Sequence, residues 1–174
     1  MKMKKLTILC LMSLSLITFN EAKAQISVGG NLGVFRPFYD NADAHLGINL
    51  VGKYEINENI RVGANLGYFF KSYDMFGSKL RSFTMPVTGL FEYSFNDEDF
   101  SPYAGADIGI YRLGLSGGGE TMASSFFGMA PVVGGNYKLS DNLLINANVK
   151  FHYILTDFES TKALGVNAGV IYKL

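Results

Sequence analysis

The clearest sign of the fold is the stretch of residues 59–73, which reads NIRVGANLGYFFKSY. Apolar side chains stand at every second position from Ile60 to Phe70, and the positions between them hold mostly glycine, asparagine and charge. A strand points successive side chains to opposite faces. The stretch therefore predicts a strand with one apolar face and one polar face.

The same alternation recurs from Ile26 to the last residue, Leu174. The expected strands cover residues 26–38, 43–56, 59–73, 80–95, 100–113, 123–139, 143–153 and 162–174. Membrane-crossing strands need roughly 9–11 residues, whereas strands of soluble proteins have about 5–6. The lengths predict an all-β fold, an eight-stranded antiparallel up-and-down transmembrane β-barrel, with apolar rows facing lipid. A soluble ligand-binding barrel, with those rows inside, is the alternative.

Residues 1–24 have the features of a cleaved export signal. Lysines at the start are followed by an apolar run over residues 6–19 and by the small-x-small motif AKA at 22–24. Gln25 is the expected first mature residue, so residues 25–174 form the barrel domain. The run is too short for a spanning helix, which needs about 20 residues. The single cysteine, Cys10, lies within the signal, so the mature chain has no thiol.

The charge of the mature chain argues against a nucleic-acid partner. The full chain has 15 basic and 15 acidic residues, and residues 1–24 hold four lysines and one glutamate. Their removal leaves 11 basic and 14 acidic residues, a net charge of −3. Proteins that bind DNA or RNA need a basic surface, so we expect none here.

The expected connections fall into two sets. Those after the second, fourth and sixth strands are short and rich in turn formers, whereas the others are longer and include a glycine-rich loop at residues 115–120. Bacterial barrels have short periplasmic turns and longer external loops. We therefore expect both chain ends on the periplasmic side.

Charged side chains on the polar rows would be enclosed by the barrel. An eight-stranded barrel is only wide enough for side chains to fill it, and enclosed charges must pair to offset their desolvation. We expect a salt-bridged plug, with a narrow ion path as the alternative. The expected lumen network consists of Lys53, Glu55, Arg61, Glu92, Asp107 and Lys150, joined by Lys173.

His45 and His152 are the only histidines, and both fall on polar rows near the expected external end. Their strands are not neighbours and no third ligand is evident, so we expect lumen histidines and no metal or other cofactor. A lipid A hydrolase would need a Ser–His pair on the lipid side. His45 has no evident serine partner, so no catalytic residue is assigned.

Two adjoining stretches, FTMPVTGLFEY at residues 83–93 and SPYAGADIG at 101–109, resemble the small outer-membrane β-barrel family described as porin-like or OmpA/OmpX-like. Members show an apolar-x-Pro strand that ends in x-Tyr, followed by Pro-Tyr-x-Gly-x-Gly. The resemblance implies an eight-stranded barrel in the outer membrane of a Gram-negative bacterium and brings no catalytic residue. One departure is the last residue, because such barrels usually end in Phe and this chain ends in Leu174.

Three arginines stand on outward phases at the expected external ends of strands, while the opposite turns are acidic. Outward guanidinium groups at such a rim can bind lipopolysaccharide phosphates, or simply reach for the membrane edge. These arginines are Arg36, Arg81 and Arg112.

These features predict a monomeric, non-catalytic barrel with a structural or surface-interaction role, in envelope integrity, adhesion or binding through external loops. Its expected partners are outer-membrane lipid, lipopolysaccharide and the barrel-insertion machinery. The alternatives are a narrow pore, a lipid A-modifying barrel enzyme and the soluble barrel. No sequence feature identifies a surface ligand.

Overall fold

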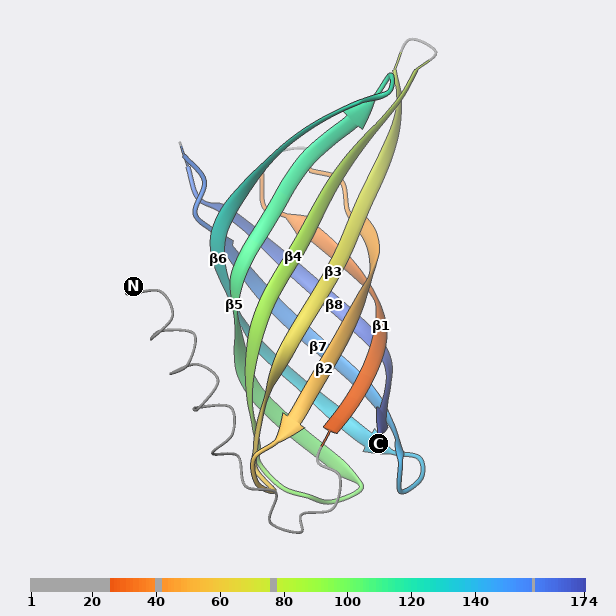
Figure 1. Ribbon diagram of the computed structural model, residues 1–174, viewed down its shortest axis with the longest axis vertical. Helices are drawn as coiled ribbons and strands as arrows, with labels where there is room; N and C mark the ends of the chain where they lie inside the picture. The colour runs from red at the N-terminus through yellow and green to blue at the C-terminus, as the bar shows by residue number, and fades with distance from the viewer. Residues whose placement is uncertain (1–25, 40–41, 76–77, 158) are drawn as a thin grey trace, which may run out of the picture.

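The computed structural model describes residues 26–39, 42–75, 78–157 and 159–174. The strands are β1 (Ile26–Pro37), β2 (His45–Glu55), β3 (Ile60–Met75), β4 (Ser78–Ser94), β5 (Phe100–Gly117), β6 (Glu120–Lys138), β7 (Leu143–Ile154) and β8 (Thr161–Lys173). Each pairs antiparallel with the next, and β8 pairs with β1 to close a barrel (Figure 1). The predicted fold is confirmed. The expected signal, residues 1–24 with Cys10, lies outside the described residues.

The apolar rows cover the outside of the barrel. Leu32 on β1 is 72 % exposed, whereas the preceding Asn31 is 7 % exposed and points into the lumen. Outward aromatic side chains gather where the strands end near the tight turns, as an interfacial belt would: Tyr54, Tyr93, Phe95, Phe100, Tyr137 and Tyr172. This arrangement suits a lipid surround. Among the described residues, no helix has the length and apolarity to cross a bilayer.

The two ends of the barrel differ. At the turn end, residues 56–59, 95–99 and 139–142 connect the strands, and Ile26 and Leu174 also lie there. The first of these turns is held by Asn57, whose Oδ1 accepts hydrogen bonds from the backbone N–H groups of Asn59 (3.0 Å) and Ile60 (2.8 Å). The opposite end is called the loop end.

The loop end corrects the expectation that its connections are longer than the turns, because only two residues separate β3 from β4 and β5 from β6. Residues 115–120 do not form a loop, because β5 and β6 stay paired up to Gly117 and Glu120. Gly118 (φ 61°) and Gly119 (φ 88°) make the tight turn, and two successive positive φ angles give the hairpin turn whose twist matches its strands. β3 and β4 likewise stay paired up to Met75 and Ser78. Both hairpins rise beyond the other strands (Figure 1).

All four prolines lie within strands, and Pro37 is the last residue of β1. Pro102 lies close to the start of β5. Around Pro86 and Pro131 the pairing with β3 and with β7 skips two positions and then resumes in the same register. Interrupted ladders, without a bulge, therefore accommodate these two prolines, which lack a backbone donor.

Candidate functional site

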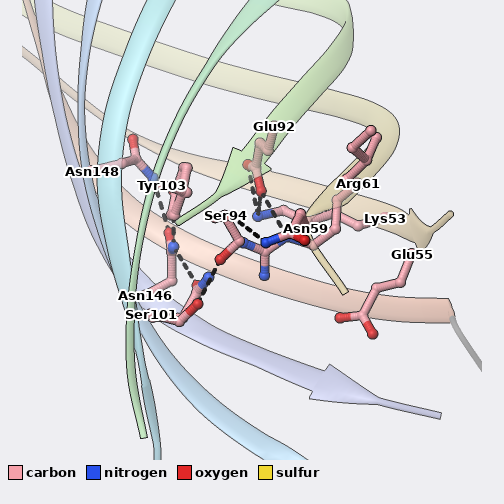
Figure 2. Close-up of polar contacts among 12 residues, drawn as sticks. Lys53, Glu55, Asn59, Arg61, Glu92, Ser94, Ser101, Tyr103, Asn146 and Asn148 are labelled. Carbon is pink, nitrogen blue, oxygen red and sulfur yellow. Dashed lines mark hydrogen bonds and ion pairs between the residues drawn. The ribbon is translucent and has the colours of Figure 1, made fainter. Parts of the chain in front are cut away.

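The lumen holds an ion-pair group near the turn end, formed by Lys53, Arg61 and Glu92 (Figure 2). Lys53 Nζ donates to Glu92 Oε2 at 2.8 Å, and Arg61 Nε lies 3.6 Å from the same oxygen. The three residues are 5–7 % exposed. Arg61 stands directly opposite Glu92 in the β3–β4 register. Both cations lie over the ring of Tyr103, at 5.2 Å for Lys53 Nζ and 5.5 Å for Arg61 Cζ.

A second buried ion pair joins β5 and β7 across the intervening β6. Lys150 Nζ is 2.6 Å from Asp107 Oδ2, and the two residues are 8 % and 2 % exposed. Thr88 on β4 lies 3.5 Å from the same Asp107 oxygen. One strand therefore separates partners that meet inside the lumen, as the narrow bore of an eight-stranded barrel allows.

Asparagines form a head-to-tail chain around the lumen. Nδ2 of each donates to Oδ1 of the next, from Asn49 to Asn167 (2.7 Å), Asn148 (3.0 Å), Asn146 (2.9 Å) and Asn136 (2.8 Å). Asn146 also donates to the Tyr103 hydroxyl at 3.0 Å (Figure 2). The chain satisfies buried amide groups that would otherwise be costly. Together with the two ion-pair groups, it forms what we call the lumen plug.

The remaining two expected lumen residues lie nearer the turn end. Lys173 Nζ is 3.2 Å from Glu55 Oε1, and their side chains are 31 % and 25 % exposed. At the turn end itself, Lys138 Nζ lies 3.0 Å from Asp141 Oδ1. The hydrogen bond to Asp141 and its negative charge raise the pKa of Lys138, and Asp99 and Asp97 add to this effect.

Towards the loop end an aromatic layer crosses the lumen, and the sequence reasoning missed it. Its signal was present, because the inward phase of four strands holds large apolar side chains at one level. The fully buried members are Phe35, Phe69, Tyr111, Ile154 and Ala163. The ring centroid of Phe35 lies 5.7 Å from that of Phe69. The layer separates the lumen plug from the loop end.

The two histidines flank this layer. The His45 ring is stacked parallel to Phe35 with centroids 6.2 Å apart, and His152 lies 5.0 Å from Phe35 on another side. The Tyr111 hydroxyl and His152 Nδ1 are hydrogen-bonded at 2.9 Å. Phe35 thus lies between the histidines. Within the described part of the chain, no cluster of three or more His, Cys, Asp or Glu side chains could hold a metal ion.

Each end of the barrel opens into a cavity, and the two share no lining residue. The turn-end vestibule has a volume of about 1080 Å³. Its lining includes Arg61, Asn136, Glu58, Asp97, Glu98 and Asp99. The loop-end cup has a volume of about 410 Å³. Its lining includes Phe35, His45, Phe83, Leu113, Met122 and Phe126. The lumen plug and the aromatic layer lie between the cavities.

The three arginines of the expected rim are exposed on the outer surface, but they do not form one group. Arg36 is on β1, across the barrel from the other two. Arg81 and Arg112 are on the neighbouring β4 and β5, where Arg81 pairs with Ser116, four positions from Arg112. At a rise of about 3.3 Å per residue this offset is about 13 Å along the strands. The Arg81 guanidinium also lies 4.9 Å from the Phe70 ring.

Solved structures of small barrels share this fold. Neisserial surface protein A superposes with a TM-score of 0.74 at 17 % identity, covering 88 % of this chain and 100 % of that one. Ail, the attachment invasion locus protein of Yersinia pestis, in complex with the heparin analogue sucrose octasulfate, superposes with a TM-score of 0.58 at 20 % identity. That match covers 84 % of this chain and 95 % of Ail. The outer membrane protein OprG of Pseudomonas aeruginosa gives 0.59 at 16 % identity, covering 86 % and 95 %.

These identities indicate a shared architecture rather than a shared ligand. A comparison with curated proteins finds no match. The family described as the outer membrane protein beta-barrel domain matches residues 6–173. Because that match spans nearly the whole chain, and the closed barrel with its lipid-facing apolar rows agrees with it, the protein belongs to the outer membrane protein beta-barrel family.

Proposed function

We propose that this outer-membrane barrel is a non-catalytic protein whose working surface is its loop end, where it binds a surface partner that presents an apolar group. One observation supports this most directly. The lumen is filled across its width by the plug and the aromatic layer, whereas the loop end offers a cup of about 410 Å³ beside two projecting hairpins. A filled lumen favours surface binding over the alternative of a narrow pore.

The hairpin of β5 and β6 supplies much of the cup. Its inward side chains at the aromatic layer and above it include Phe126, Leu113, Leu115 and Met122, and Met122 is 76 % exposed. At the loop end, which we place on the cell exterior, such side chains face water. Exposed apolar patches of this kind mark binding surfaces. We infer that the cup accepts an alkyl or aromatic group of the partner.

A unique tryptophan can test the cup, because the chain has none of its own. Phe126→Trp places the indole in the cup, and Phe127→Trp places it on the opposite, outward face. We would titrate each variant in lipid nanodiscs with an ω-bromo fatty acid, whose bromine quenches nearby indole. Saturable quenching confined to the Phe126→Trp variant is expected. Equal, non-saturating quenching of both variants would contradict a binding cup.

We also propose that Arg81 and Arg112 bind phosphates of lipopolysaccharide, because they lie on neighbouring strands of one face. Arg36, on the other side of the barrel, would bind a different lipopolysaccharide phosphate. Replacing all three by Gln should reduce the lipopolysaccharide that co-purifies with the barrel by at least about half, since charge-assisted contacts are lost. The control Lys138→Gln removes a positive charge at the turn end instead. Unchanged retention in the triple variant would refute this role.

A further inference from the structure

The turn-end vestibule contains a buried cation that its surroundings only partly neutralise. In the lumen plug, Lys53 Nζ forms an ion pair with Glu92 Oε1 at 2.8 Å, and Lys150 Nζ forms one with Asp107 Oδ2 at 2.6 Å. Arg61 is the third cation, and its nearest carboxylate is the Glu92 group that Lys53 already occupies. Nε and Nη2 of Arg61 are both buried and lack a hydrogen-bond partner. A buried guanidinium in this state calls for another acceptor.

A second unused donor lines the same cavity. Asn136 is 2 % exposed, and its Oδ1 already accepts from Asn146, while its Nδ2 has no hydrogen-bond partner. Asn146 links the two residues, because it donates both to Asn136 and to the hydroxyl of Tyr103, whose ring lies under the Arg61 guanidinium. Arg61 and Asn136 both line the vestibule, and two such N–H donors, one of them charged, match the two oxygens of a carboxylate.

The mouth of the vestibule has the opposite charge. Glu58, Asp97, Glu98 and Asp99 line it, and none of these carboxylates makes an ion pair within the described residues. The lysines nearby are already engaged, Lys138 by Asp141 and Lys173 by Glu55. This negative mouth would repel a phosphate or another multiply charged anion, but it would attract an ammonium group.

We propose that the vestibule binds a zwitterionic amino acid or short peptide, with its carboxylate held by Arg61 and Asn136 and its ammonium group at the acidic mouth. The ligand's carboxylate neutralises the excess positive charge of the lumen. Its ammonium group meets the uncompensated carboxylates of residues 58 and 97–99. A volume of about 1080 Å³ admits either kind of ligand, because small-molecule pockets span roughly 300–1,000 Å³. The site is independent of the loop-end cup.

The test uses alanyl-alanine as the probe, titrated calorimetrically into the full barrel in nanodiscs. Two blocked peptides, N-acetyl-alanyl-alanine and alanyl-alanine amide, each lack one charge. We expect saturable binding of the free dipeptide and at least about tenfold weaker binding of each blocked form, because each loses a charge-assisted contact. Equal affinity for the amide, equal affinity for acetate, or no binding of the dipeptide would overturn the proposal.

Variants separate the two ends of the ligand. Asp97→Asn combined with Glu98→Gln alters only exposed turn residues, so the barrel fold is kept. This variant should bind the free dipeptide several-fold more weakly. Its affinity for N-acetyl-alanyl-alanine should be unchanged or slightly higher. Arg61→Gln should abolish binding of both, while heat-dependent gel migration checks that it folds. If the variant with Asp97→Asn and Glu98→Gln bound the free dipeptide with wild-type affinity, this would contradict the assigned orientation.

Discussion

Asp107 is buried in the lumen at 2 % exposure, with its Oδ2 2.6 Å from Lys150 Nζ. The variant Asp107→Asn keeps the shape of the side chain but leaves the Lys150 ammonium group without its counter-charge. Removing one partner of a buried ion pair costs about 3–5 kcal/mol. We expect Asp107→Asn to lower the free energy of unfolding by about this amount, measured by urea titration in lipid vesicles.

Two further variants make this test specific. The double variant Asp107→Leu, Lys150→Met removes both charges, so it should be more stable than Asp107→Asn alone. The exposed pair of Lys138 and Asp141 serves as the control, and Lys138→Met should hardly change stability because water screens its charge. A double variant less stable than Asp107→Asn would show that desolvation of Lys150 is not the dominant cost.

At the scale of elements, the β5–β6 hairpin depends on its two-glycine turn. Gly118 has a φ of 61°, a conformation that β-branched residues adopt only at a cost of about 1–2 kcal/mol. We expect Gly118→Val to fray the hairpin tip, so that the amides of Gly117 and Glu120, the pair that flanks the turn, exchange with solvent at least about tenfold faster by NMR. Gly118→Asn, which tolerates this φ, should exchange like the wild type.

The number and order of strands could be predicted because the dyad alternation persists in every strand. The loop-end boundaries could not. Glycines 117–119 have no side chain, so the alternation of apolar and polar residues cannot be followed through them. From the sequence alone, a tight turn at these positions cannot be distinguished from an open loop. Register is likewise invisible in one sequence. The sequence does not reveal, for example, that the strands keep their register on both sides of Pro86 and of Pro131.

The inward charges follow from the same alternation, since their phase alone puts them on the lumen face. Their partners do not, because Lys150 and Asp107 meet across an intervening strand and this depends on how far the barrel is sheared. The aromatic layer was missed for a related reason. Phe35, Phe69 and Tyr111 are far apart in sequence, and only the closed barrel brings them to one level.

For the whole molecule, we predict export with loss of residues 1–24. Protein isolated from outer membranes should have an N-terminus at Gln25 by mass spectrometry. Unboiled samples should migrate differently from boiled ones on a detergent gel, because a closed barrel satisfies all its strand hydrogen bonds internally and resists detergent until heated. An uncleaved chain, or one that stays in the aqueous fraction without detergent, would contradict this prediction.

Two successive barriers close the lumen, so conduction should require the loss of both. In planar bilayers we expect no stable current steps from the wild-type barrel. Phe35→Ala removes the central ring of the aromatic layer, at a cost of about 3–5 kcal/mol in stability, yet it leaves the asparagine chain and the Lys150–Asp107 pair in place. It should therefore also fail to conduct. Steps in Phe35→Ala alone would make the aromatic layer the sole barrier, and steps in the wild type would revive the narrow pore.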